Sequence, residues 1–357
     1  MPRSDATWSH RRQQWRAYAR RFRRTALTAG RSQEFVSSCL RYAERLAAGG
    51  LPVVYDQEHL SRLVGVKAEY LRAVSNWAKP FYHRYVIAKR SGKPREIAAP
   101  LPILKAVQRW ILREILAQLP ATRYSKAYEA GCSIRTNARF HLRQPVLLLI
   151  DIQDFFPSIE LPRVYRLFRD VGYRRDVAAM LAGITTLDKC LPQGAPTSPH
   201  IANLICRRID ARIGGFCLPQ KVRFTRYADD IAISGDFDHV RMIRFVQRVL
   251  ADDRFVMACG KTRVRFQHQR QCVTGVIVNE YRQADRKVRR RLRQEAYFIS
   301  RFGLADHMQR CEIEQSNYRQ HLAGKANHVR FINRSDRDAA HMLRVLSQLD
   351  GKEKLSG

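Results

Sequence analysis

Two short stretches of the sequence decide its fold. Residues 146–151 read VLLLID, an apolar run that ends in an acid, and residues 227–230 read YADD, with two adjacent acids. The apolar run is typical of a strand buried on both faces, so it predicts a central strand in a covered sheet. Residues 221–234 alternate as a β-hairpin with a polar tip does. We therefore expect Asp151 at the end of one strand and Asp229 and Asp230 at a hairpin tip, where adjacent side chains can approach one point.

The three acids suit metal-assisted chemistry. A carboxylate at the end of an apolar strand is costly to leave unpaired, and two adjacent carboxylates repel unless a cation or proton neutralises them. Mg²⁺ prefers oxygen ligands and is usually held by a few carboxylates together with substrate phosphates. Asp151, Asp229 and Asp230 therefore fit a site with two Mg²⁺ ions, one activating an attacking hydroxyl and the other steadying a leaving pyrophosphate. The competing interpretation is that Asp229 and Asp230 are ordinary turn residues.

The rest of the chain is strongly basic. Its 65 Lys and Arg residues against 32 Asp and Glu residues give a net charge of +33. Such a charge favours a polyanionic partner, and nucleic acid is the first candidate. A membrane partner is not expected, because no apolar run approaches the roughly 18 residues that a spanning helix needs. The eight cysteines are dispersed and form no CxxC pair, which favours reduced thiols in the cytoplasm.

The remaining pattern predicts helices at both ends and a mixed centre, an α+β organisation. A hairpin is expected from two short runs, 85–88 and 95–98, with a turn at 91–92. Ser198 as N-cap and Pro199 at the first helical position predict the start of a helix. Further helical sequence is expected, in chain order, within residues 1–31 as a basic amphipathic helix, over 33–48, in short pieces within 56–76, from Pro102 onward, and over 285–345.

Three motifs resemble those of reverse transcriptases in their order and spacing. They read DIQDFFPSI at residues 151–159, LPQGAPTSP at 191–199 and YADD at 227–230. The first and third resemble the metal-binding motifs of a polymerase palm, and the second resembles the motif that cradles the incoming nucleotide and template base. The resemblance implies a nucleotidyltransferase shaped as a right hand, with fingers, a palm containing an antiparallel sheet, and a helical thumb.

Four features make the resemblance closest to bacterial retron enzymes. Residues 137–141 read NARFH, residues 273–275 read VTG, the second motif ends in APTSP, and the chain stops soon after a basic helical segment. This resemblance implies synthesis of multicopy single-stranded DNA on a structured noncoding RNA, primed by a guanosine 2′-hydroxyl of that RNA. It also implies an RNA–DNA hybrid intermediate, a role in antiphage defence, and a separate effector protein that no motif here identifies.

On this basis the chain divides into four parts. We expect a basic helical N-terminal region over residues 1–80, the fingers and the start of the palm over 81–145, the palm with its catalytic motifs over 146–280, and a basic helical thumb with a tail over 281–357.

The resemblance also implies roles for residues beyond the metal ligands. Lys93 and Arg95 resemble the fingers element that contacts the nucleotide triphosphate, although cations are also common at solvated hairpin tips. Gln193 matches the glutamine that packs near the incoming sugar. Lys261 matches a lysine proposed as the general acid for pyrophosphate departure.

Phe156 matches the aromatic residue that blocks a ribose 2′-hydroxyl and so selects deoxynucleotides. Its neighbour Phe155 is the alternative, since the assignment could slip by one and leave either ring in the core.

Several further residues are candidates for nucleic-acid binding. Asn137 and His141 lie four residues apart and could share a helix face, with structural and RNA-positioning roles both open. A thumb helix that grips the RNA backbone would explain six cations within eight residues. The candidates are Asn137, His141, Val273, Thr274, Gly275, Arg286, Lys287, Arg289, Arg290, Arg291 and Arg293. The Arg-rich residues 20–24 could bind either RNA or a partner protein, and both alternatives stay open.

Two other functions remain as alternatives. The first is another bacterial reverse transcriptase class, of the abortive-infection or diversity-generating type. The second is a non-catalytic RNA-binding scaffold that uses charge alone. Intact acids at Asp151, Asp229 and Asp230 argue against the scaffold, because such a protein gains nothing from an acid cluster at a nucleic-acid site.

Overall fold

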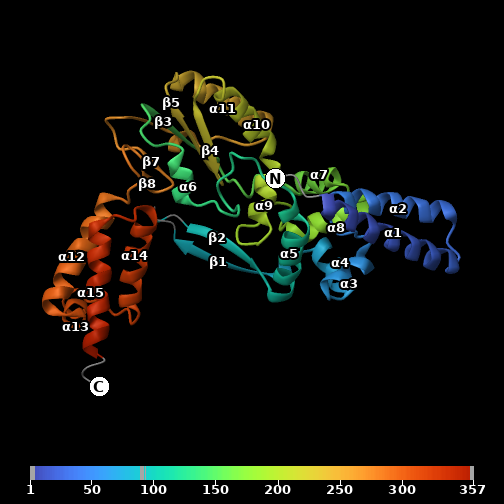
Figure 1. Ribbon diagram of the computed structural model, residues 1–357, viewed down its shortest axis with the longest axis horizontal. Coiled ribbons are helices and arrows are strands. Elements are labelled where there is room, and N and C mark those ends of the chain that lie inside the picture. The colour runs from blue at the N-terminus through green and yellow to red at the C-terminus, as the bar shows by residue number, and fades with distance from the viewer. Residues whose placement is uncertain (1–4, 89–91, 93, 354–357) are drawn as a thin grey trace. The chain divides into compact units, whose positions relative to one another are not determined.

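The computed structural model describes residues 5–88, 92 and 94–353, and the chain forms two compact units that alternate along the sequence (Figure 1). The first unit comprises Met1–Thr122 and Asp154–Arg208, and the second comprises Arg123–Gln153 and Ile209–Gly357. The predicted mixture of helix and sheet with helical ends is confirmed.

The first unit is mainly helical. The predicted helix over 33–48 is confirmed as α2: Ser32 caps its start by accepting a hydrogen bond from the Phe35 amide, and Gly49 ends it. Buried side chains recur along one face of α2, including Val36, Leu40 and Leu46, as amphipathic packing requires. The helices of this unit are α1 (Asp5–Thr28), α2 (Gln33–Ala48), α3 (Gln57–Val64), α4 (Ala68–Asn76), α5 (Pro102–Glu114), α7 (Leu161–Val171), α8 (Arg175–Thr185) and α9 (Ser198–Ile205), with short 3₁₀ turns at Lys79–Phe81 and Leu116–Gln118.

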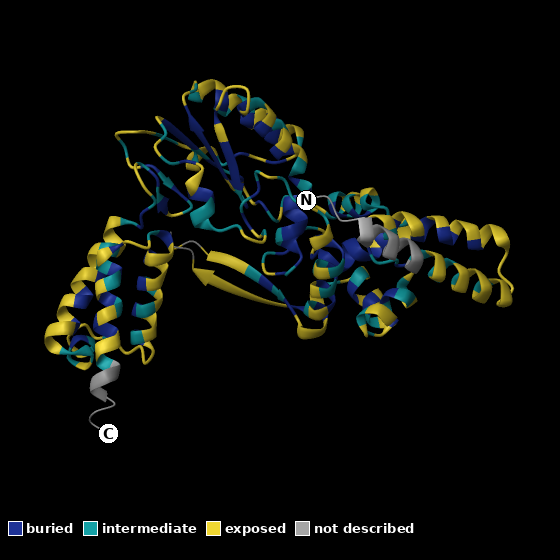
Figure 2. Cartoon of the chain, viewed as in Figure 1, coloured by how far each residue is buried: buried dark blue, intermediate teal, exposed yellow. Residues whose placement is uncertain are grey.

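A long hairpin also belongs to the first unit. Strands β1 (Tyr82–Ala88) and β2 (Pro94–Pro100) pair antiparallel, with Tyr82 opposite Pro100 and Val86 opposite Glu96. Beyond Tyr82 the first strand is exposed along its length, drawn in yellow in Figure 2. The predicted hairpin is therefore confirmed, whereas Ser91, one of its two predicted turn residues, lies outside the described residues.

The start of α9 differs from the prediction. The N-cap is Thr197 rather than Ser198, and Ser198 is already the first helical residue. The Ser198 hydroxyl donates a hydrogen bond to the Pro192 carbonyl oxygen, 2.7 Å away, and Thr197 makes no side-chain capping bond.

The second unit is built on a four-stranded antiparallel sheet. Its strand order is β4 (Arg223–Tyr227), β5 (Asp230–Gly235), β3 (Val146–Asp151) and β6 (Arg263–Phe266). The apolar strand β3 is interior, pairing with β5 on one side and β6 on the other, as its sequence predicts. The helices α10 (Arg207–Cys217) and α11 (His239–Asp252) pack together through Phe216 and Phe245, whose ring centroids are 4.0 Å apart.

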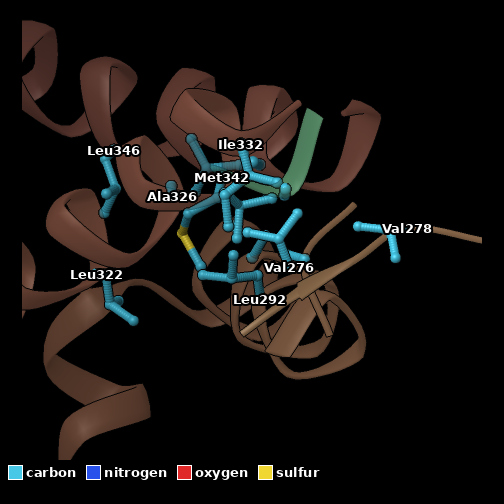
Figure 3. Close-up of a cluster of buried hydrophobic side chains, with 14 of the residues drawn as sticks. Val276, Val278, Leu292, Leu322, Ala326, Ile332, Met342 and Leu346 are labelled. Carbon is cyan, nitrogen blue, oxygen red and sulfur yellow. The ribbon is translucent and has the colours of Figure 1, made fainter. Parts of the chain in front are cut away.

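A helical bundle completes the second unit. It contains α12 (Arg286–Phe302), α13 (Leu304–Arg310), α14 (Tyr318–Ile332) and α15 (Arg337–Glu353). Its core, with Leu292, Leu322 and Met342, continues into Val276 and Val278 beside the short strands β7 (Cys272–Val273) and β8 (Val276–Ile277) (Figure 3). The same core includes buried side chains of the sheet, at positions 147 and 232. The bundle and the sheet therefore share one apolar core.

Across the part of the chain that the structure describes, no helix combines the length and apolar character needed to cross a membrane.

Candidate active site

The three predicted acids meet at one end of the sheet. Asp151 ends β3, Asp230 begins β5, and the two residues stand directly opposite each other in the antiparallel register. Asp229 lies at the tip between β4 and β5, and its carbonyl oxygen accepts a hydrogen bond from the Ile152 amide at 3.1 Å. Opposed residues in an antiparallel pair point to the same face, so Asp151 and Asp230 share one face of the sheet.

The hairpin tip has an unusual backbone conformation. Ala228 has a φ of +58°, in the left-handed region that residues other than glycine rarely adopt. A buried arginine holds this residue: Arg226 Nη1 donates to the Ala228 carbonyl oxygen at 3.0 Å. Both residues of the pair Arg226 and Asp210 are 0% exposed, and two hydrogen bonds of 2.7 and 2.8 Å join the guanidinium to the carboxylate.

Arg226 and Asp210 were not predicted from the sequence as functional residues. A signal exists, because Arg226 is a charged residue within a strand two positions before Ala228, and Asp210 interrupts an apolar face that continues at Ile209 and Ile213. A buried charge without a partner is expensive, so each of these residues predicts the other once both are known to be buried.

The electrostatics of the acids reflect their crowding. Although Asp230 keeps some surface open to solvent, desolvation by the dense protein around it, followed by the carboxylates of Asp229 and Asp151, raises its pKa to about 6. Lys261, in a 3₁₀ turn, points to the same place, with Nζ 2.8 Å from Asp151 Oδ1. This hydrogen bond raises the pKa of Lys261 and keeps it protonated.

The donor set suits a hard divalent cation in its chemistry. All three side chains offer carboxylate oxygens, and their mutual repulsion at Asp230 is what a cation would relieve. Within the described residues, however, no three His, Cys, Asp or Glu side chains are gathered as a ready-made metal cage. Mg²⁺ commonly takes only one or two carboxylates and completes its shell with water and substrate phosphates. The three acids therefore fit a magnesium site in which water and substrate phosphates supply the remaining ligands.

A cavity of about 210 Å³ adjoins the acids in the second unit. Its lining includes Asp151, Asp230 and Lys261 together with Asn137 and Thr274. Asn137 lies on α6 (Ile134–Arg139) and is 1% exposed, with Nδ2 3.5 Å from Thr274 Oγ1. Its Oδ1 has no hydrogen-bond partner among the described residues. The cavity thus brings three predicted nucleic-acid residues, Asn137, Val273 and Thr274, beside the predicted catalytic residues.

His141 and Val273, also nucleic-acid candidates, are almost completely buried. His141 is 0% exposed, and its ring nitrogens each lie 2.7 Å from a hydroxyl oxygen, of Ser234 and of Thr225. The geometry favours the structural role for His141. Its two hydrogen bonds connect the segment after α6 to β4 and β5. Val273 is 1% exposed and packs in the bundle core, and it also lines the cavity beside the acids, so its contact with nucleic acid stays a prediction. Thr274 and Gly275 form the turn after it, both with positive φ.

The first unit holds a second cavity, of about 310 Å³, next to the hairpin. Arg95 and Gln193 both line it. The Gln193 carbonyl oxygen accepts a hydrogen bond from the Ala98 amide at 2.8 Å, which fastens the LPQG segment to β2. Arg84 also lines this cavity and pairs with Glu96 and Asp188. Sequence reasoning missed Arg84, and no pattern in the sequence marks it.

The two phenylalanines of the first motif, Phe155 and Phe156, differ in how far they are buried. Phe155 is 4% exposed and belongs to the core, whereas Phe156 is only partly buried and contacts Phe155 with ring centroids 5.4 Å apart. Of the two rings, Phe156 is the one with surface to offer a ligand. Lys93 lies outside the described residues.

The predicted cations of the thumb surround α12. Leu292, Ala296 and Ile299 form its buried stripe. Two of the cations have acidic partners, Arg289 with Asp336 at 3.8 Å and Arg291 with Glu295 at 2.9 Å. The remaining four are exposed and form no ion pair with described residues: Arg286, Lys287, Arg290 and Arg293.

The structure thus gathers the predicted site residues in two groups. Asp151, Asp229, Asp230 and Lys261 stand together in the second unit with Asn137 and Thr274 close by. Arg95 and Gln193 stand together in the first unit.

Comparisons with known proteins agree with the motifs. Residues 87–297 match the family model described as reverse transcriptase (RNA-dependent DNA polymerase). The chain is 34% identical over 240 residues to the retron Ec86 reverse transcriptase of Escherichia coli, covering 66% of this chain and 75% of that protein. It is 30% identical over 359 residues to the retron Mx65 reverse transcriptase of Myxococcus xanthus, covering 93% and 81%.

Among solved structures, a telomerase from Candida albicans bound to a fragment of telomeric RNA is similar at 11% identity and a TM-score of 0.44. The match covers 76% of this chain and 63% of the telomerase chain. A likeness of this size carries no argument about function.

Proposed function

Because the chain belongs to the reverse transcriptase (RNA-dependent DNA polymerase) family, and within it to the retron type, we propose that it copies a structured noncoding RNA into multicopy single-stranded DNA. The observation that carries the proposal is the cross-strand pairing of Asp151 with Asp230 beside Asp229. An acid cluster of this kind has no use in a basic protein that only binds RNA.

The catalytic step falls to the second unit. Asp151, Asp229 and Asp230 are proposed to hold two Mg²⁺ ions, which would activate the attacking hydroxyl and stabilise charge on the leaving pyrophosphate. Arg226 and Asp210 keep the Asp229 tip in position through the Ala228 carbonyl. Lys261 is protonated and lies at the acids, so its Nζ can donate a proton to the departing pyrophosphate.

Nucleotide binding is proposed for the cavity beside the hairpin. The Arg95 guanidinium suits the triphosphate because its planar fork donates two parallel hydrogen bonds to phosphate oxygens. Gln193 would lie against the sugar, and Phe156 would exclude a ribose 2′-hydroxyl. Lys93 remains a candidate for a second phosphate contact.

Template and product are proposed to follow the basic surfaces. The four unpaired cations of α12 suit phosphate contacts that position the RNA or the RNA–DNA hybrid. Asn137, Thr274 and Gly275 lie next to the acids and suit contact with the nucleic acid that enters there. The division into an N-terminal region, fingers, palm and thumb, with bounds at 80, 145 and 280, is part of this proposal.

The finer activity follows the retron relatives. We infer that a 2′-hydroxyl of the noncoding RNA primes synthesis and leaves a branched RNA–DNA molecule, and that the product acts with an effector protein in antiphage defence. RNase treatment of nucleic acid from expressing cells should leave DNA joined to a short RNA stub. Unbranched DNA would favour another bacterial reverse transcriptase class.

Primer extension tests the catalytic proposal. With Mg²⁺ and deoxynucleotides the wild type should extend a DNA primer on RNA, and Asp229→Asn/Asp230→Asn should abolish extension while RNA binding survives. The matched control is Asp252→Asn/Asp253→Asn, which removes two adjacent charges at the end of α11 and should leave extension intact. Extension that survives in the Asp229→Asn/Asp230→Asn variant would exclude these acids from catalysis.

A further inference from the structure

A cavity of about 600 Å³ in the second unit is lined by six arginines and one acid. It shares no lining residue with the cavity beside the acids. The six arginines come from segments far apart in the sequence: Arg135, Arg139, Arg143, Arg223, Arg282 and Arg334. We call this cavity the arginine basin.

Helix α6 separates the arginine basin from the acid site. Its capping box, formed by Ser133 and Thr136, fixes where the helix begins. Arg135 and Arg139 are four residues apart and therefore share one face of the helix, which lines the basin. Asn137 lies between them and lines the cavity of the acids instead. One short helix thus serves two different sites.

The charge in the basin is not neutralised by the protein. Glu280 is the single acid in the lining, and none of the six arginines forms an ion pair within the described residues. The pKa of Arg282 is lowered by burial and then by the nearby guanidiniums of Arg135 and Arg139. Arg135 Nε is buried and has no hydrogen-bond partner among the described residues. Like charges are therefore held together at a cost that an anion would offset.

The basin is also built to keep its shape. Arg223 Nη1 donates to the Phe140 carbonyl oxygen at 3.0 Å, and Arg143 Nε donates to the Glu280 carbonyl oxygen at 2.9 Å. These neutral acceptors orient both guanidiniums without cancelling their charge. Oriented forks are suited to phosphate, whose oxygens accept paired hydrogen bonds.

We propose that the arginine basin binds the phosphodiester backbone of an unpaired RNA segment, outside the catalytic site. With a volume of about 600 Å³ and arginines from several segments in its lining, the cavity has room for more than one phosphate group. Tyr281 in its lining is 56% exposed, which gives an unpaired base a ring to stack on. This combination of arginines and an open aromatic ring favours RNA over an acidic peptide.

The inference rests on the proposed function, because it assumes that RNA is the ligand of this chain. The basin would anchor a part of the RNA that is not being copied and so hold the template near the site. Phosphate contacts of this kind set position and affinity without reading sequence.

The salt dependence of RNA binding tests the basin. The probe is a fluorescein-labelled, mixed-sequence RNA of about 12 nucleotides, and the variant is Arg139→Gln/Arg334→Gln, since both side chains are exposed and bonded to no described residue. Each lost phosphate contact should reduce the slope of log affinity against log salt by about 0.7, or about 1.4 for the pair. The control is Arg241→Gln/Arg248→Gln on α11, with the same charge loss on an exposed face, and it should keep the wild-type slope.

Two further measurements make the test specific. Photocrosslinking of the same RNA carrying 4-thiouridine should label peptides around Tyr281 in the wild type and lose that label in the basin variant. Equal slopes in variant and control, no crosslink at the basin, or equally tight binding of a polyglutamate peptide would each overturn the proposal.

Primer extension on a poly(rA) template with an oligo(dT) primer separates RNA binding at the basin from the proposed polymerase activity. An inactive wild type would refute the polymerase proposal alone, while crosslinking still reports on the basin.

Discussion

At the scale of single residues, the buried pair of Arg226 and Asp210 is the feature on which the acid site depends. Its guanidinium serves two acceptors, the Asp210 carboxylate and the Ala228 carbonyl oxygen. The second bond holds the residue before Asp229 at a positive φ. Arg226 is therefore a positioning residue that acts on the reaction through the backbone.

Arg226→Lys should separate positioning from charge. A single ammonium cannot bond both Asp210 oxygens and the Ala228 carbonyl, so we expect a loss of about 2 kcal/mol or more in unfolding free energy, as for disrupted buried pairs. In folded protein, kcat for primer extension should fall at least about tenfold with little change in the KM for deoxynucleotide. Steady-state kinetics below the unfolding temperature measure this split.

Arg212→Lys is the matched control, because Arg212 pairs with Asp252 at a partly exposed site and such pairs contribute little. An unchanged kcat in the Arg226→Lys variant would contradict a positioning role.

We expect the burial of His141 to make the stability of the protein depend on pH. Desolvation by burial lowers its pKa to about 3 in the folded state, against about 6.5 in the unfolded chain. Between these values the unfolded chain binds more protons, so unfolding free energy should fall as pH drops through this window, by up to about 1.4 kcal/mol per pH unit. Above pH 6.5 this contribution is constant.

Denaturant unfolding of the wild type and His141→Gln at several pH values checks the effect. The variant lacks the titrating ring, so the difference in stability between the two proteins should shrink as pH falls from 6.5. A difference that stays constant over this range would refute the assignment.

The acids that we propose for catalysis are easier to recognise in the sequence than the buried residues that support them. Asp151, Asp229 and Asp230 stand out because acids at strand ends break an apolar pattern. Arg226 and His141 support the site from inside the core, and their burial depends on contacts between distant segments that periodicity does not reveal. Arg84 is similar, since its partner Asp188 lies 104 positions away in the chain.

At the scale of elements, local signals determined what could be predicted. Helix α2 is bounded by a capping serine, Ser32, and by Gly49, and β3 is a continuous apolar run. Because these signals are local, both elements were predicted correctly. The predicted start of α9 was one residue off, because Thr197 and Ser198 are both typical N-cap residues and the N-cap, Thr197, makes no side-chain capping bond that would mark it.

The contact between β2 and the LPQG segment yields a test at this scale. A Cβ added at Gly194 would lie 2.7 Å from the Ala98 carbonyl oxygen, and Gly194 has a φ of +129°. Gly194→Ala should therefore destabilise the first unit by about 1–3 kcal/mol and raise the KM for deoxynucleotide by displacing Gln193. Thermal unfolding and primer-extension kinetics measure the two effects.

Gly215→Ala on α10 is the control, since an added Cβ there meets nothing within 4 Å. It should stabilise the protein by roughly 0.5–1 kcal/mol, because alanine favours a helix over glycine. Equal behaviour of the two variants would show that the close approach at Gly194 has no consequence.

At the scale of the whole molecule, the chain builds each compact unit from separated segments. A linear division of the sequence, such as the one at residues 80, 145 and 280, does not reveal this arrangement. The helical ends and the mixed centre were predicted from periodicity, but which segments share a core depends on the path of the chain in space.

The core shared by the sheet and the helical bundle predicts that the two loosen together. Leu322 is 0% exposed in that core, and Leu322→Ala should cost about 2–5 kcal/mol. Hydrogen exchange followed by mass spectrometry should show faster exchange in α14 and also across β7 and β8. The control Gln320→Ala changes an exposed position on the same helix. Faster exchange confined to α14 would contradict a common core.

The ion pair between Lys261 and Asp151 has a consequence for how the acids accept a cation. Its ammonium acts as a counter-ion to the Asp151 carboxylate, so a divalent ion bound there would take the place of the lysine rather than fill an empty cage. Displacement of this kind would leave the Lys261 ammonium free to reach a substrate phosphate.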